Sequence, residues 1–191
     1  CRLGNVDETN PVITDIKNMV KKLKQRDDVT IFGIDSIVTE GEIVTLQAGD
    51  LISLHNYAKD KILPMRTVEV PKAGDLVVTG LQSWGINLYQ TGKGLHAAWN
   101  AVRQDGEGEI LLVAPCPDGV GNANYENTMI ECKDKDLQEA LGYVLDYYCG
   151  IDTFKIGNQK PVDLLRILKT VGESNVKMIT EMDKELLETV F

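Results

Sequence analysis

The apolar positions in the first third of the chain predict a helix, a strand hairpin and a second helix. Asn10-Pro11 places an Asn cap before a Pro at the first helical position, and apolar residues then recur at helical spacing: Val12, Ile16, Met19, Val20 and Leu23. The segments 29–38 and 42–46 are typical of two strands around a turn at Glu40-Gly41. A second helix is predicted from Asp50 to Leu63, with Pro64 ending it.

Beyond Pro64 the pattern changes to short apolar runs that alternate with helical segments. Strands are predicted over 66–70, 75–79, 109–114 and 176–180. The compact runs that begin at Asp75 and Glu109 are typical of strands buried on both faces of a sheet. Helices are predicted over 87–102, 136–148, 162–169 and 184–190.

This alternation predicts an α/β fold: a mostly parallel sheet with helices on both faces, in a Rossmann-like three-layer arrangement. The boundary is best placed between Pro64 and Pro71, which divides the chain into residues 1–66 and 67–191. We interpret 67–191 as a C-terminal α/β domain, and 1–66 as part of it or as a linker to another domain. Ligands of such sheets bind beyond the carboxyl ends of strands, here the loops 80–90 and 116–122.

Composition narrows the class of partner. The 191 residues are 43% hydrophobic and 26% charged, which is ordinary for a globular protein of one domain or slightly more. A net charge of -9 argues against nucleic acid and against anionic membranes, whereas one or two local cations suffice for a small anionic substrate. No apolar run approaches the roughly 20 residues that span a bilayer.

The cysteines and histidines do not predict a metal site within this chain. The four cysteines form no CxxC pair, and His55 and His96 lie far apart. Reduced thiols and a cytoplasmic location are therefore expected. Because the first residue is Cys1 rather than Met, we expect a processed product or a fragment of a longer polypeptide.

The candidate chemistry lies in the segment 85–94, which follows a predicted strand and opens a helix. Asn87 can cap that helix, and Gln90 and Lys93 then lie three residues apart on one face of its first turns. An amide and an ammonium beside the positive end of a helix dipole suit an anionic substrate. Tyr89 is a weaker candidate because it points about 100° away from Gln90 around the helix.

Each of these residues also has an ordinary structural role. Gln90 occupies the position of a capping-box Gln, and Lys93 fits a surface lysine. His96 could extend the face of Lys93, but the sequence supplies no orienting partner for it. Cys116 fits a buried small hydrophobic residue. The glycine-rich segment 118–122 could cradle a phosphate with backbone amides, although a simple turn explains it better.

With these segments in place, the chain resembles the C-terminal half of nickel-dependent lactate racemases and related 2-hydroxyacid racemases. The resemblance lies in Asn87-Leu-Tyr-Gln-Thr-Gly-Lys-Gly-Leu95 and in the strand from Glu109 that ends in Pro-Cys-Pro-Asp-Gly. Arg2-Leu-Gly-Asn5, Asn10-Pro-Val12 and Lys155-Ile-Gly-Asn-Gln-Lys160 resemble further family segments. Many members carry an acidic residue where this chain has Gly85, so loop shape and substrate choice are expected to differ.

The resemblance implies a function that this chain does not perform alone. In the family a nickel-pincer nucleotide, tethered to a lysine and ligated by histidines, lies in an N-terminal domain, and none of those motifs occurs here. No cofactor is therefore expected on this chain by itself. The resemblance implies that Gln90 and Lys93 orient a 2-hydroxyacid while the cofactor takes and returns hydride, which makes the chain an inactive part of an isomerase.

An alternative of another class remains open at this point. The chain would then be a non-catalytic α/β module that binds a nucleotide or phosphate at segment 118–122, or a pure interaction domain. A cleft lined by Gln90 and Lys93 favours the racemase interpretation. A phosphate or nucleotide bound at segment 118–122, with Gln90 and Lys93 pointing away from any cleft, favours the binding module.

Overall fold

The computed structural model describes residues 10–81, 85–150 and 152–191. The chain divides into two compact units, with the boundary between Val70 and Pro71. This boundary lies within the seam that the sequence predicts between Pro64 and Pro71. The segment Arg2–Asn5, which resembles a family motif, lies outside the described residues.

The first unit consists of a helix, a hairpin and a second helix, as predicted. It comprises α1 (Pro11–Lys24), β1 (Gly33–Thr39), β2 (Glu42–Gly49) and α2 (Leu51–Arg66). The strands are antiparallel, and the turn residues Glu40 and Gly41 have φ of 51° and 83°. Two successive positive φ values match the right-handed twist of the strands, which explains the glycine at this turn.

Two predictions near the end of this unit are wrong. Helix α2 does not end before Pro64 but continues to Arg66, because a proline in the last turn removes only one backbone hydrogen bond. The N–H of Thr67 already bonds again to the carbonyl of Leu63, at 2.9 Å. Residues 67–70, predicted as part of a strand, belong to no strand in the structure.

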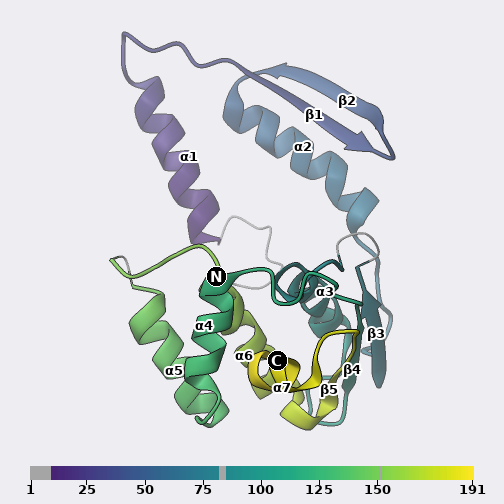
Figure 1. Ribbon diagram of the computed structural model, residues 1–191. Coiled ribbons are helices and arrows are strands. Elements are labelled where there is room, and N and C mark those ends of the chain that lie inside the picture. The colour runs from purple at the N-terminus through teal and green to yellow at the C-terminus, as the bar shows by residue number, and fades with distance from the viewer. Residues whose placement is uncertain (1–9, 82–84, 151) are drawn as a thin grey trace. The chain divides into compact units, whose positions relative to one another are not determined.

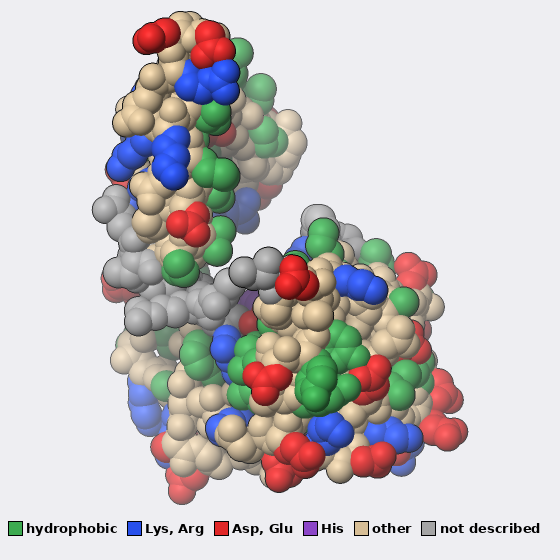
Figure 2. All heavy atoms as spheres, turned by 90° about the vertical axis from the view of Figure 1, so that its left-hand side faces the viewer, with side chains coloured by type: hydrophobic (Ala, Val, Ile, Leu, Met, Phe, Trp, Pro, Cys, Tyr) green, Lys and Arg blue, Asp and Glu red, His purple; other side chains and the backbone are tan. Residues whose placement is uncertain are grey.

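Helix α1 has the predicted apolar stripe, but the stripe is not covered. Its N-terminus is capped by Asn10, whose side chain accepts from the N–H of Val12 at 3.0 Å. The stripe residues are 45–60% exposed: Val12, Ile16, Met19 and Leu23. Figure 2 shows hydrophobic side chains beside lysines on the unit that contains α1.

The second unit is built on a parallel sheet flanked by helices, which confirms the predicted α/β class (Figure 1). The strands lie in the order β3 (Leu76–Gly80), β4 (Glu109–Val113), β5 (Val176–Ile179). The helices are α3 (Leu88–Ala101), α4 (Ala123–Cys132), α5 (Leu137–Tyr148), α6 (Gln159–Val171) and α7 (Lys184–Val190), with a short 3-10 turn at Glu173–Asn175. Helix α4 was not predicted, because its apolar positions form only a weak periodic pattern.

The sheet buries one face more completely than the other. In β4 the side chains of Ile110 and Leu112 are fully buried, and α3 packs against β3 and β4 on that side. On the other face Leu76 and Val78 are 57% and 60% exposed. The prediction that both strands are buried on both faces is therefore wrong for β3, and it is also wrong for the central strand β4, whose Val113 on the same face is 41% exposed.

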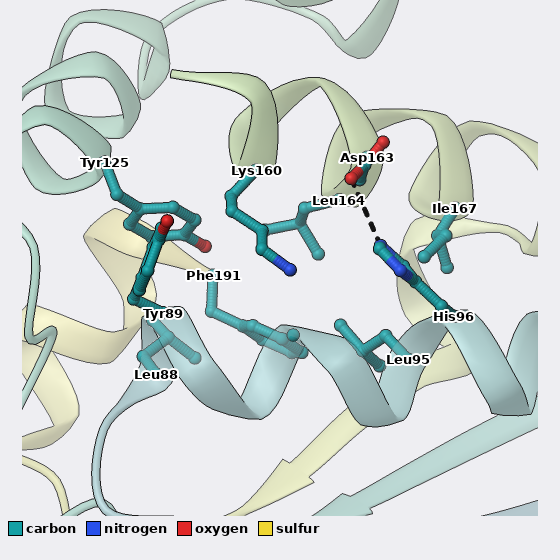
Figure 3. Close-up of a pocket in the computed structure, with 11 residues that line it drawn as sticks. Leu88, Tyr89, Leu95, His96, Tyr125, Lys160, Asp163, Leu164, Ile167 and Phe191 are labelled. Carbon is teal, nitrogen blue, oxygen red and sulfur yellow. Dashed lines mark ion pairs between the residues drawn. The ribbon is translucent and has the colours of Figure 1, made fainter. Parts of the chain in front are cut away.

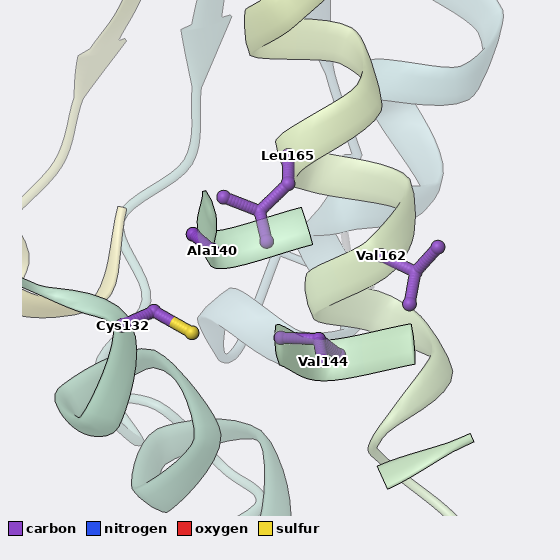
Figure 4. Close-up of a cluster of buried hydrophobic side chains, with 5 residues drawn as sticks. All are labelled: Cys132, Ala140, Val144, Val162 and Leu165. Carbon is purple, nitrogen blue, oxygen red and sulfur yellow. The ribbon is translucent and has the colours of Figure 1, made fainter. Parts of the chain in front are cut away.

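The helices have a hydrophobic cluster of their own, which fixes α5 and α6 against each other (Figure 4). Its buried members come from three helices: Cys132, Ala140, Val144, Val162 and Leu165. Helix α6 also packs on α3.

Candidate functional site

The candidate site begins with a capped helix, as the sequence predicts. Asn87 is the N-cap of α3, and its side-chain oxygen accepts from the N–H of Gln90 at 3.0 Å. Its backbone carbonyl accepts from both the N–H and the hydroxyl of Thr91. The cap therefore fixes the first turn, which carries Gln90 and leads to Lys93.

The remaining N-terminal amides of α3 are bonded to a neighbouring loop. The N–H groups of Leu88 and Tyr89 donate to the carbonyls of Gly119 and Val120, both at 3.0 Å. With Asn87 bonded to Gln90, the first three helical amides are all used. An anion at this helix end must therefore be bound by side chains, because these N–H groups are not available to it.

The side chain of Gln90 does not complete a capping box. Its Oε1 is buried and has no hydrogen-bond partner among the described residues. A capping-box Gln would use this oxygen to accept from the backbone of its cap residue. A buried acceptor without a partner costs about 1–3 kcal/mol, so the ordinary structural explanation of Gln90 does not account for its position.

Lys93 lies less than one turn further along α3 and is exposed. The spacing of three residues places it on the same face as Gln90. The positive charge of Lys93 also repels that of Lys160 on α6, and this repulsion contributes to the lowered pKa of the Lys160 ammonium. The first turns of α3 thus carry the exposed Lys93 and, three residues before it, Gln90 with its buried Oε1.

Tyr89 lines a small cavity between α3 and α6 (Figure 3). Its ring contacts the edge of the Tyr125 ring, with the centroids 6.5 Å apart, and the Nζ of Lys160 lies 5.9 Å from its own centroid. The cavity that these residues line is about 10 Å³, room for one water at most. It cannot hold a hydroxyacid.

His96 has a partner that the sequence did not reveal. Its Nε2 lies 3.2 Å from an oxygen of Asp163 on α6, and both side chains are largely buried (Figure 3). Lys160 lies one turn earlier on α6, and burial is the main cause that lowers its pKa. Residues 160 and 163 share one face of α6 by their spacing, which was the available signal for this group.

The glycine-rich loop is bonded to the first turn of α3. The N–H groups of Asp118 and Gly119 donate to the carbonyls of Ile86 and Cys116, and the loop carbonyls bond α3 as described. At the start of the loop, Cys116 is 2% exposed, as predicted for a small hydrophobic residue. Its φ of 51° is unusual for a residue other than glycine and was not expected.

Among the described residues, no group of His, Cys, Asp and Glu is placed to hold a metal ion. The described cysteines, Cys116, Cys132 and Cys149, form no disulfide. In the part of the chain that the structure describes, every helix is too short or too polar to cross a membrane.

These observations together describe an α/β domain whose capped helix presents an amide and an ammonium, and comparison with known proteins identifies its class. Residues 71–190 match the model of the lactate racemase C-terminal domain, so the chain belongs to that family. A comparison with curated proteins gave no significant match.

A solved structure extends the likeness to nearly the whole chain. The chain is similar to the lactate racemase apoprotein from Thermoanaerobacterium thermosaccharolyticum, with 26% sequence identity and a TM-score of 0.77. The match covers 96% of this chain but only 42% of that protein. The chain thus spans less than half the length of the racemase it matches.

Proposed function

We propose that this chain is the C-terminal part of a cytoplasmic isomerase that interconverts the stereoisomers of a 2-hydroxyacid. The observation that carries the proposal is the buried, unpartnered Oε1 of Gln90 at the start of α3, on the helix face that also bears Lys93. Membership of the lactate racemase family supports the reaction class. The substrate would be a small anion, which suits a local cation in a chain of net charge -9.

The two side chains have complementary roles in this proposal. The Oε1 of Gln90 accepts a hydrogen bond from the substrate hydroxyl and so orients the carbon that carries it. The ammonium of Lys93 balances the carboxylate and any negative charge that develops on the neighbouring oxygen. Tyr89, predicted as a third substrate-binding residue, packs on Tyr125 and would act by holding the first turn of α3.

The rest of the catalytic machinery would come from another part of the polypeptide. The described residues offer no metal cluster, so a nickel-pincer nucleotide and the acid–base groups would be held by an N-terminal domain. The match to less than half of a lactate racemase supports such a missing part. We therefore expect no cofactor and no racemase activity on the 191-residue chain alone.

The test replaces the two side chains in a full-length racemase that contains this chain. We expect Lys93→Ala to lower kcat by about 10²–10³, as removal of a group that stabilises developing charge does. Gln90→Leu keeps the size of the side chain and is expected to raise KM for D- and L-lactate. Racemisation is followed by circular dichroism of the hydroxyacid.

The matched control is Lys133→Ala, which removes an exposed lysine on the surface beyond α4. This control is expected to leave both kcat and KM unchanged. Unchanged turnover in Lys93→Ala, with the control equally active, would remove the proposed role of Lys93. Loss of activity in all three variants would indicate a general effect of charge or stability instead.

A further inference from the structure

A polar hollow lies in the second unit, and neither Gln90 nor Lys93 lines it. It has a volume of about 490 Å³, within the range of small-molecule sites. Its walls come from α4, the end of α5 and the segment before α6: Asn124, Asn127, Glu131, Tyr147, Tyr148, Asp152, Thr153, Phe154, Lys155 and Asn158. The proposed function assigns no role to it.

Glu131 is a fixed negative charge in this hollow. The hydroxyls of Tyr143 and Tyr148 both donate to its Oε2, the first at 2.6 Å. These two hydrogen bonds are the main causes that lower the pKa of the Glu131 carboxyl. Because both bonds end on Oε2, the lone pairs of Oε1 remain for a donor from outside.

Asn158 supplies an independent sign of a ligand. It is only 2% exposed, and its Oδ1 has no hydrogen-bond partner in the described part of the chain. It precedes α6 as the N-cap residue, yet its side chain makes no capping bond. A buried amide oxygen that neither caps its helix nor bonds elsewhere leaves an acceptor to be satisfied.

The remaining walls favour a cation that carries N–H groups. The hollow has two carboxylates, Glu131 and Asp152, against one ammonium, Lys155. The amide nitrogen of Asn124 is already committed to the carbonyl of Ile156, at 3.0 Å. The three aromatic rings of the hollow belong to Tyr147, Tyr148 and Phe154, and such rings attract cations at their faces.

We propose that this hollow binds a guanidinium group, held by the carboxylate of Glu131 and the amide oxygen of Asn158. A guanidinium is planar and offers five N–H donors, so it can serve both acceptors and lie against an aromatic ring. The group would belong either to a small free molecule or to an arginine side chain of a polypeptide. Both sources share the same recognition chemistry.

The test is a titration of the ¹⁵N-labelled 191-residue chain followed by NMR. Methylguanidinium is expected to shift the amide signals of Asn124, Glu131 and Asn158 in a saturable way. Tetramethylammonium, which has the charge but no N–H donor, is expected to bind at least ten-fold more weakly. Agmatine and N-acetyl-arginine-N-methylamide then distinguish the two sources by which of them binds more tightly.

Variants separate recognition from the general attraction of an acidic protein. Glu131→Gln and Asn158→Leu are each expected to weaken methylguanidinium binding about ten-fold, whereas Glu173→Gln removes an exposed carboxylate that does not line the hollow. Should Asn158→Leu fail to fold, the affinity of Glu131→Gln for methylguanidinium by itself tests the proposal. Equal weakening by Glu131→Gln and Glu173→Gln, or equal binding of tetramethylammonium, would overturn the proposal.

Discussion

At the scale of single residues, the site depends on how closely one loop approaches the cap of α3. A Cβ at Gly121 would lie 2.2 Å from the side chain of Asn87, and the φ of Gly121 is +77°. Both observations require glycine, because a side chain there would be strained and would displace the cap. The same loop provides the carbonyls that bond the first amides of α3.

We therefore expect Gly121→Ala to lower the free energy of unfolding by about 1–3 kcal/mol. The measurement is urea denaturation followed by circular dichroism. Gly142→Ala is the matched control, since Gly142 lies within α5 with nothing within 4 Å of a new Cβ. That change is expected to stabilise by about 0.4–1 kcal/mol. Equal effects of the two changes would contradict the close approach described here.

At the scale of elements, helix α6 packs against α3 and α4, and it carries Lys160 at this contact. The charged form of Lys160 destabilises the folded state, because the side chain is partly buried. Burial lowers the pKa of Lys160 below its usual value, and the charge of Lys93 lowers it further, against the opposing effect of Asp163. In the unfolded chain the pKa returns to about 10.5. Between the two pKa values the unfolded chain binds a proton that the folded chain does not, so stability rises with pH across that range.

We expect Lys160→Met, which removes the charge and shortens the side chain by one atom, to raise the free energy of unfolding at pH 7. This advantage is expected to shrink as the pH rises through the two pKa values, because the lysine is neutral in both states only above about pH 10.5. Unfolding in urea at several pH values measures it. Lys133→Met, an exposed lysine, serves as the control, and the same pH dependence in both variants would refute the burial of Lys160 as the cause.

At the scale of the whole molecule, the two units differ in how well they bury their apolar residues. Helix α1 has no buried residue, whereas α6 buries seven: Pro161, Val162, Leu164, Leu165, Ile167, Leu168 and Val171. The second unit thus has a core of its own, and the family match begins at residue 71, where that unit begins. We infer that it is the part of the chain that folds autonomously.

The fragment Pro71–Phe191 is accordingly expected to unfold in one cooperative step. Its free energy of unfolding should lie within about 0.5 kcal/mol of that of the same region in the longer chain, as for independent parts. Denaturation of both proteins, monitored by tryptophan fluorescence and far-ultraviolet circular dichroism, measures this. A fragment without a cooperative transition would show that the first unit is needed for folding.

Much of the fold follows from the sequence because its signals are local. The cap at Asn87, the Pro11 helix start and the Glu40-Gly41 turn all depend on residues within a few positions of each other. The apolar runs likewise located β3, β4 and β5. Helix α4 and the end of α2 were missed or misplaced because packing overrode weak local preferences.

The sequence alone therefore determined most of the elements and their alternation, and it predicted Gln90 and Lys93 on one helix face. Only the tertiary structure decided that the amides of α3 are bonded by a distant loop and that Gln90 keeps a buried oxygen without a partner among the described residues. It also decided that Asp163 pairs with His96 and that the Oδ1 of Asn158, beside a polar hollow, has no hydrogen-bond partner among the residues described. Such contacts join residues far apart in the chain, and local periodicity carries no information about which of them meet.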